Sequence, residues 1–374
     1  MDPATHTIVV GAGPAGLAVA AGLGSRGVPY TLLERSEDVG WSWRNHYERL
    51  HLHTVKQFSS LPGMRFPEHV GLYPSRDEVV AYLEAYARRF KVTPRLGEGV
   101  QRARREHGLW HVETDRGTHR AKNLVLATGY NRVPREVRWP GQEAFQGTVL
   151  HSREFRSGRP FQGKRVLVVG MGNTGGELAL DLWESGATVA LAVRSPRHVV
   201  PRDVYGIPAQ VNSLFVLSRL PIALADRLSL RLLDRVVGDL APYGLPRPSE
   251  GPLTQVVERG RIPLIDIGTI ALVKQGKLPV LPPPERFTPT GVVHADGVER
   301  PWDAVLAATG YHPGLEELLE GASQVLNERG YPRVHGAESA LPGLYFLGFR
   351  NPLTGQLHDI AREARRITAA LGGA

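Results

Sequence analysis

The hydrophobic pattern at the start of the chain predicts a strand, a glycine-rich turn, a helix and a second strand. The apolar run Thr7–Val10 leads directly into the turn, and an Ala- and Leu-rich stretch follows it. A second apolar run, Tyr30–Glu34, completes the pattern of a βαβ unit. Residues 41–75 show no periodicity, and Ser75 with Glu78 has the spacing of a capping box that begins the next helix.

The same pattern recurs in the middle of the chain. Arg165–Val169 predicts a strand, a second glycine-rich turn follows it, and Thr188–Val193 predicts the strand after the next helix. Elements like those of the first unit return near the end, with a strand at 343–348 and a helix from about Gln356. The fold class is therefore α/β, with two nested Rossmann-like dinucleotide-binding domains. We expect the first domain at 1–155 and 309–374, and the second at 156–308 with a helical insert at about 204–240.

The first glycine-rich turn has the form of a pyrophosphate-binding fingerprint. Gly11 permits a tight turn, Gly13 lets a phosphate approach the backbone, and Gly16 lets the helix pack closely on the strand. The helix N-terminus offers free N–H groups to the phosphates. Glu34, which ends the next strand, can accept hydrogen bonds from ribose hydroxyls and would repel a ribose phosphate. The sequence predicts an FAD or NAD site formed by Gly11, Gly13, Pro14, Ala15, Gly16 and Glu34.

The second turn differs in the residue type that discriminates between dinucleotides. The position that corresponds to Glu34 is occupied by Arg194, followed by Ser195. A guanidinium can bind a ribose 2′-phosphate through paired hydrogen bonds, so this turn predicts an NADPH site. The predicted site residues are Gly170, Gly172, Asn173, Thr174, Gly175, Arg194 and Ser195.

Three further glycine positions fit the same arrangement. Ala127-Thr128-Gly129 and Ala308-Thr309-Gly310 each end an apolar run, and glycine permits close approach of the backbone to a cofactor. Because each lies downstream of a dinucleotide fold, we interpret them as the junctions between the domains. Gly348 follows the last strand, and the helix after it could stabilise negative charge on a reduced flavin through its N-terminus.

Composition narrows the function classes. The 374 residues contain no cysteine, which excludes redox-active thiol pairs and thiolate metal sites within them. The net charge of +8 is spread along the chain without an aromatic-interleaved basic stripe, so we expect no nucleic-acid partner. Without a leader pattern or an uncharged apolar run of about 18 residues, we expect a cytoplasmic protein with no transmembrane segment. Oligomeric state is not indicated.

The helical insert leaves several interpretations open. Arg227, Arg231 and Arg235 recur every four residues beside Leu228 and Leu232. This spacing is compatible with an amphipathic helix on a membrane surface, a lid over a substrate pocket, or a packed surface helix.

At this point the chain resembles a known family. The segment from Phe145 to Phe155, with Gly147 and His151, matches the Phe-x-Gly-x-x-x-His-x-x-x-Phe/Tyr pattern of flavin-containing monooxygenases. The related Baeyer–Villiger enzymes carry Trp at the position of Phe155. The chain is most similar to YUCCA-type enzymes of plants and their bacterial relatives. The segments that carry this resemblance are 50–53, 56–58, 193–195, 198–202, 243–248 and 264–268.

The resemblance implies a function and a set of site residues. NADPH would reduce FAD, O2 would add to the reduced flavin as a C4a-(hydro)peroxyflavin, and one oxygen atom would pass to a small organic substrate. His53 occupies the position where other family members carry an Asn beside the flavin and nicotinamide, and Lys56 and Gln57 follow it as further catalytic candidates. His151 is expected to be structural. The remaining cofactor-binding candidates are Arg35, Trp43, Arg44, Val100 and Leu357.

The substrate and the type of oxygenation stay open at this stage. Oxidative decarboxylation of an aromatic 2-oxo acid such as indole-3-pyruvate would require a cation for the carboxylate, for which Lys56, Arg202 and Arg350 are candidates. N- or S-oxygenation and Baeyer–Villiger oxidation are alternatives within the family. Outside it remain an NAD(P)H-dependent flavin reductase without oxygenation and a non-catalytic NADPH-binding protein.

Overall fold

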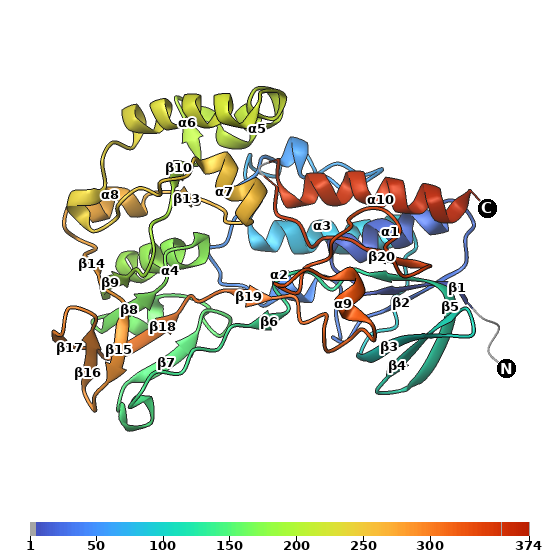
Figure 1. Cartoon of the computed structure of the whole chain (residues 1–374), viewed down its shortest axis with the longest axis horizontal. Coiled ribbons are helices and arrows are strands. Elements are labelled where there is room, and N and C mark those ends of the chain that lie inside the picture. The colour runs from blue at the N-terminus through green and yellow to red at the C-terminus, as the bar shows by residue number, and fades with distance from the viewer. Residues whose placement is uncertain (1–4, 353, 374) are drawn as a thin grey trace. The chain divides into compact units, whose positions relative to one another are not determined.

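The computed structural model describes residues 5–352 and 354–373, and the chain divides into two compact units (Figure 1). Unit 1 is drawn from 1–45, 54–133 and 311–374, and unit 2 from 46–53 and 134–310. The sequence-based boundary near residue 155 assigned 134–155 to the first domain. Here these residues belong to unit 2, because the strand at Thr148–His151 pairs with the strand at Ala304–Ala307.

Unit 1 is built on a six-stranded mixed sheet with the order β2-β1-β5-β4-β3, in which β20 also pairs with β5. β1 lies between β2 and β5 and is parallel to both, whereas β3, β4 and the first half of β5 form an antiparallel meander. The strands are β1 (Thr5–Val10), β2 (Tyr30–Leu33), β3 (Val100–Glu106), β4 (Leu109–Thr114), β5 (Gly117–Leu126) and β20 (Leu344–Phe346), with a short piece at β19 (Tyr311–His312). The two-residue strand β6 (Val133–Pro134) falls on the boundary between the units.

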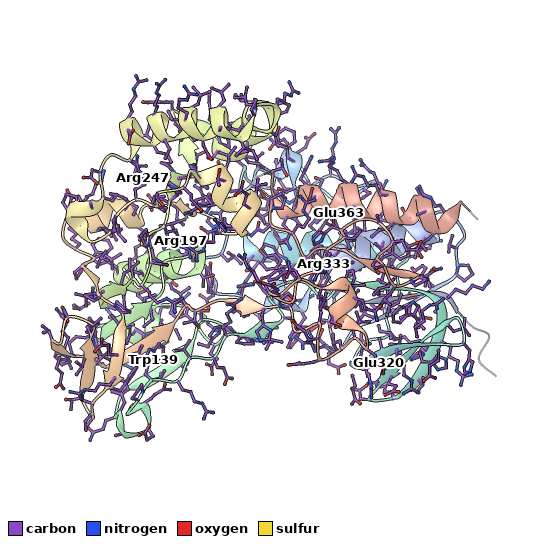
Figure 2. All side chains as sticks on the ribbon, viewed as in Figure 1. Trp139, Arg197, Arg247, Glu320, Arg333 and Glu363 are labelled. Carbon is purple, nitrogen blue, oxygen red and sulfur yellow. The ribbon has the colours of Figure 1, made fainter. Side chains whose placement is uncertain are left out.

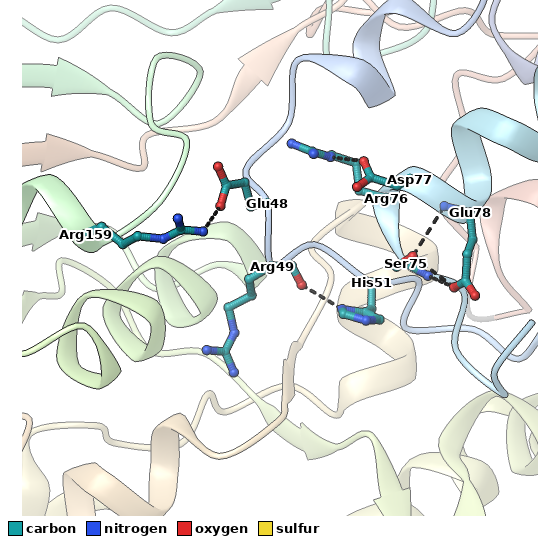
Figure 3. Close-up of polar contacts among 8 residues, drawn as sticks. All are labelled: Glu48, Arg49, His51, Ser75, Arg76, Asp77, Glu78 and Arg159. Carbon is teal, nitrogen blue, oxygen red and sulfur yellow. Dashed lines mark hydrogen bonds and ion pairs between the residues drawn. The ribbon is translucent and has the colours of Figure 1, made fainter.

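The three long helices of unit 1 lie together along one side of this sheet (Figure 1). The long ones are α1 (Pro14–Gly24), α3 (Arg76–Arg89) and α10 (Gln356–Gly372), and α1 packs against the other two. The predicted capping box is confirmed, since Ser75 N donates to Glu78 Oε2 at 2.8 Å and Glu78 N donates to Ser75 Oγ at 3.3 Å (Figure 3). The short helices are α2 (Trp41–Arg44), η1 (Lys56–Phe58) and α9 (Ala322–Val325).

Unit 2 is built on a five-stranded, fully parallel sheet with the order β14-β9-β8-β18-β7. Side chains alternate across β8: Val166 and Val168 pack in the core with helix α4, and Leu167 and Val169 pack with a small antiparallel sheet. The strands are β7 (Thr148–His151), β8 (Arg165–Val169), β9 (Thr188–Ala192), β14 (Val280–Leu281) and β18 (Ala304–Ala307); the antiparallel sheet is β15 (Pro284–Phe287), β16 (Gly291–His294) and β17 (Glu299–Pro301).

The other elements of unit 2 are mostly helices. They are α4 (Asn173–Glu184), α5 (Ala209–Phe215), α6 (Ile222–Val236), α7 (Pro252–Arg259) and α8 (Thr269–Lys274), the short turns η2 (Gln142–Ala144), η3 (Arg159–Phe161), η4 (Leu217–Arg219) and η5 (Ala241–Tyr243), and the strand pairs β10 (Val199–Pro201) with β13 (Leu264–Asp266) and β11 (Asp203–Val204) with β12 (Ile207–Pro208). The predicted insert at 204–240 therefore contains α5 and α6.

A buried carboxylate fixes α6 to α7. Asp226, which is 7% exposed, accepts hydrogen bonds from Leu253 N at 2.7 Å, Thr254 N at 3.2 Å and Thr254 Oγ1 at 2.6 Å. These donors lie in the first turn of α7, where backbone N–H groups have no partner within the helix. Asp226 thus caps a helix that begins far away in the sequence. Within the described residues, no helix combines the length and apolarity that a bilayer crossing requires.

Candidate active site

The two glycine-rich turns have the same local geometry. Gly11 and Gly170 both adopt positive φ, at 103° and 108°, a region that favours glycine. A Cβ at Gly11 would lie 2.8 Å from Ala127 O, and a Cβ at Gly170 would lie 2.6 Å from Ala308 O. Each turn is therefore packed against the first residue of an Ala-Thr-Gly segment, which follows a neighbouring strand.

In each turn, one glycine is required by close packing and another lies next to empty space. A Cβ at Gly16 would lie 1.8 Å from Gly11 O, and one at Gly175 would lie 2.0 Å from Gly170 O. By contrast, a Cβ at Gly13 or Gly172 would meet nothing within 4 Å. Gly13 and Gly172 immediately precede α1 and α4, so the open space lies at a helix N-terminus. Both turns thus fit the pyrophosphate of a dinucleotide.

Unit 1 brings most of its predicted cofactor residues to the first turn. Glu34 Oε2 accepts from Ala12 N at 2.6 Å, which fixes the carboxylate beside the turn. A Cβ at Gly348 would lie 3.0 Å from the Cβ of Ala15, so the C-terminal loop meets the start of α1. Thr128 Oγ1 is buried and has no hydrogen-bond partner within the described residues. An unpaired buried hydroxyl at this place fits a ligand that would supply the partner.

The other predicted residues of unit 1 take varied positions. Gly40 N donates to Ala12 O at 3.1 Å, which brings α2, with Trp43 and Arg44, toward the first turn. Arg44 itself is paired with Glu84. Glu98 N donates to Glu34 O at 2.8 Å, placing the start of β3 at Val100 near Glu34. The side chain of Arg35 is exposed, and that of Leu357 is buried in the core.

The second turn is anchored within unit 2 by side-chain contacts. Asn173 Oδ1 accepts from Ile265 N at 2.7 Å, so this predicted cofactor residue also ties α4 to β13. Thr309 Oγ1 donates to Arg135 O at 2.7 Å, and Arg135 N donates to Gly310 O at 2.9 Å. Arg194 and Ser195 are exposed just beyond β9, and the Arg194 guanidinium forms no ion pair with the described residues.

The three catalytic candidates differ in their surroundings. Lys56 Nζ donates to Glu68 O at 2.7 Å, to Pro67 O at 3.4 Å and also to Val70 O, so its ammonium group holds the 67–70 segment. The side chain of Gln57 is exposed. Lys56 and Gln57 belong to unit 1, whereas His53 belongs to unit 2. There the His53 imidazole lies against Glu177, a residue that the sequence analysis did not select.

The segment from Phe145 to Phe155 is part of the core of unit 2. Phe145 packs edge-to-face on Phe287, and Phe155, which is 1% exposed, stacks near Phe161. A Cβ at Gly147 would lie 2.5 Å from the Phe145 ring, so the glycine is needed for this packing. His151 Nδ1 accepts from Arg153 N at 3.1 Å. These contacts place Phe145, Gly147 and Phe155 in the packing of unit 2, and the structural role of His151 stays a prediction.

Sequence analysis also missed a buried charge cluster in unit 1. Arg350 Nη1 lies 3.8 Å from both Asp359 Oδ2 and Glu363 Oε1, and these two carboxylates are 8% and 4% exposed. Burial and the neighbouring Asp359 raise the pKa of Glu363 to about 7. Burial and Arg350 lower the pKa of His335 to about 4. The i, i+4 spacing of two acidic residues on the apolar face of an amphipathic helix was the available signal.

We expect Glu363→Gln to remove a pH dependence of stability (Glu363 is labelled in Figure 2). Because the pKa of Glu363 is raised on folding, the native state binds more protons than the unfolded state between about pH 4.5 and about pH 7. Stability should therefore fall as pH rises through this window. At about pH 8 the variant should be more stable than the parent by on the order of 2 kcal/mol.

Thermal midpoints of the holoenzyme across this pH range provide the measurement. Glu320→Gln is the matched control, because Glu320 is exposed in an ion pair with Arg102. His335 contributes a second pH dependence. Because its pKa is lowered on folding, stability is lost as pH falls from about 6.5 toward about 4. Equal pH profiles for Glu363→Gln and the parent would contradict the assignment.

Comparisons with known proteins bear on the family to which the chain belongs. The family model described as pyridine nucleotide-disulphide oxidoreductase matches residues 8–208. The indole-3-pyruvate monooxygenase YUCCA1 of Oryza sativa subsp. japonica is 40% identical over 367 residues, covering 96% of this chain and 90% of the relative. The chain belongs to the flavin-containing monooxygenases. A member of known structure, the flavin-containing monooxygenase from Stenotrophomonas maltophilia, is 25% identical with a TM-score of 0.75, covering 100% of this chain and 99% of that one.

Family membership makes the chain a flavin monooxygenase that depends on FAD and NADPH. The cyclohexanone monooxygenase from Rhodococcus sp. Phi1, solved bound to NADP+, has a TM-score of 0.71 over 99% of this chain and 84% of that one. At 19% identity this is a likeness of fold alone. The 374 residues contain no cysteine, so no redox-active disulfide can form within them.

Proposed function

We propose that the two units are nested Rossmann-like domains, with FAD bound at the first turn and NADPH at the second. The open space at Gly13 and Gly172 supports a pyrophosphate at each turn. Glu34 beside the first turn favours ribose hydroxyls, whereas the unpaired guanidinium of Arg194 favours a ribose 2′-phosphate. The two turns are alike in backbone and differ in this charge, which supports different dinucleotides at the two sites.

We further propose that the substrate is an aromatic 2-oxo acid such as indole-3-pyruvate. The observation that carries this is the 40% identity, over 96% of the chain, to an indole-3-pyruvate monooxygenase. Bound FAD, reduced by NADPH, would supply the activation of O2. In the overall reaction the C1–C2 bond of the 2-oxo acid breaks with loss of CO2, and C2 gains one oxygen atom to give the shortened acid. NADPH supplies two electrons as a hydride, a proton is taken up, and the second oxygen atom leaves as water.

The protein would contribute binding and orientation. The substrate carboxylate requires a cation, and the three candidates are held differently. Because Lys56 Nζ already donates to backbone carbonyls, we propose that it shapes its own loop. Arg350, with a side chain 53% exposed, and Arg202, paired with Asp203 at 3.3 Å, are then the candidates for the carboxylate. His53 would contact the nicotinamide or the flavin.

Turnover of indole-3-pyruvate tests the proposal. The purified holoenzyme, supplied with NADPH and O2, should form indole-3-acetate and CO2 in equal amounts, with one NADPH consumed per product. Because hydrogen peroxide decarboxylates 2-oxo acids without an enzyme, the assay must contain catalase. Product that persists with catalase supports the proposal. NADPH oxidation with peroxide release and no product, alongside coupled turnover of an amine or sulfide, would contradict it and favour N- or S-oxygenation.

A further inference from the structure

A histidine and a carboxylate meet on the helix that follows the second turn. His53 Nε2 lies 2.7 Å from Glu177 Oε1, although the contact is not aligned as an ideal hydrogen bond. The side chains are 19% and 2% exposed. Two lone pairs would repel at this separation, so a proton must lie between the nitrogen and the oxygen.

Glu177 stands on the buried face of α4, where a carboxylate is costly. Its neighbours on the helix are buried, among them Gly176, Leu178 and Ala179. No Lys or Arg forms an ion pair with Glu177 within the part of the chain that the structure describes; His53 is its recorded partner. Apolar replacements of such buried pairs are often neutral or stabilising. Stability therefore gives no reason for a carboxylate at this position.

Among the residues that the structure describes, the second ring nitrogen of His53 lacks a hydrogen-bond partner, which a ligand would supply. Nδ1 is buried and has no hydrogen-bond partner within the described residues. Leaving such an atom unpaired is unfavourable, and a bound group that supplied the hydrogen bond would remove this cost. Glu177 lies two positions after Gly175, so the imidazole is attached to the part of α4 that begins at the second turn.

We propose that Glu177 is a positioning residue, which fixes the His53 ring through Nε2 so that Nδ1 hydrogen bonds the nicotinamide riboside part of the dinucleotide. This inference rests on the proposed binding of NADPH at the second turn. A single ring nitrogen suits a ribose hydroxyl or the carboxamide, each of which exchanges one hydrogen bond with it. The pyrophosphate has other partners, because the backbone N–H groups at the start of α4 are available to it.

The rate of flavin reduction by NADPH tests the proposal. The holoenzyme of each variant is mixed rapidly with NADPH without oxygen, and the limiting rate is separated from the apparent dissociation constant. For Glu177→Gln we expect the limiting rate to fall about tenfold or more, because an amide oxygen accepts a weaker hydrogen bond than a carboxylate and holds the ring orientation less firmly. The dissociation constant should change much less, since the turn and Arg194 hold the phosphates. Glu184→Gln on the same helix, where the exposed carboxylate pairs with Arg49, should leave both unchanged.

Glu177→Met separates positioning from a structural role. It removes one partner of the pair and leaves Nε2 of His53, whose side chain is 19% exposed, to hydrogen bond with water, so the thermal midpoint should be equal to or slightly below that of the parent. Reduction should nevertheless be as slow as in Glu177→Gln. A parent-like rate in Glu177→Met, or a lower midpoint with an unchanged rate, would overturn the proposal.

The double variant His53→Asn/Glu177→Gln tests whether the two residues act together. If Glu177 acts through His53, the double variant should be no slower than the slower single variant. Multiplying losses would overturn the positioning role while leaving the proposed function intact. Failure of NADPH to reduce the parent flavin at all would overturn both.

Discussion

Gly13→Val should yield a folded protein that retains no FAD. Gly13 has φ −78° and ψ −174°, an extended conformation that any residue adopts, and a Cβ there meets nothing within 4 Å. The chain can therefore accommodate valine, at a helix-capping cost on the order of 1 kcal/mol. The pyrophosphate can no longer bind, because the valine side chain would occupy the space in which the phosphates approach the backbone. The flavin-to-protein absorbance ratio, before and after incubation with excess FAD, measures the loss.

Two matched variants make this result specific. Gly172→Val makes the same change at the second turn, so it should keep FAD and lose reduction by NADPH. Gly16→Ala should instead destabilise the fold, because its Cβ would lie 1.8 Å from Gly11 O. Retention of FAD by Gly13→Val, or its loss from Gly172→Val, would contradict the assignment of that turn, and both results together would reverse the two assignments.

The elements around both turns could be predicted because their signals are local. The run Thr7–Val10 lies within β1, Thr5–Val10, and the helix expected from Gln356 begins at that residue. Apolar alternation, glycine spacing and a capping box each depend on residues a few positions apart. The prediction of the helical insert was less accurate, since the pattern at 204–240 did not show the break between α5 and α6.

Contacts between distant segments could not be predicted in this way. Asp226 caps α7, Gly348 packs on Ala15, and Glu177 meets His53, although each pair is separated by many residues. For Lys56, by contrast, the sequence suggested a catalytic role that no contact of its side chain with the described residues indicates. Its position in a family-like segment suggested chemistry, whereas the structure shows its ammonium group bound to backbone carbonyls. A charged residue on an otherwise apolar helix face, as at Glu177, is the sequence signal that deserved a hypothesis.

Arg194→Ala should weaken the use of NADPH while leaving NADH nearly unaffected. The guanidinium lies exposed beyond β9, and no described residue neutralises it. Glu34 holds the corresponding position beyond β2 in unit 1, so the two sites differ in the charge that would face a ribose 2′-phosphate. Loss of a charge-assisted contact costs roughly 1.5–3 kcal/mol. This corresponds to roughly a 10- to 150-fold rise in the apparent NADPH constant.

The effect must be distinguished from a general loss of positive charge. Arg235→Ala is the matched control, because Arg235 is exposed on α6 of the same unit and the net charge of +8 falls by one in both variants. Long-range attraction acts on NADPH and NADH alike and weakens with salt, whereas a direct phosphate contact discriminates between them. Flavin reduction by each nucleotide at two salt concentrations separates these causes. An equal loss with NADPH and NADH in Arg194→Ala would show that this side chain does not bind the 2′-phosphate, and the preference would then have to come from another cation of unit 2.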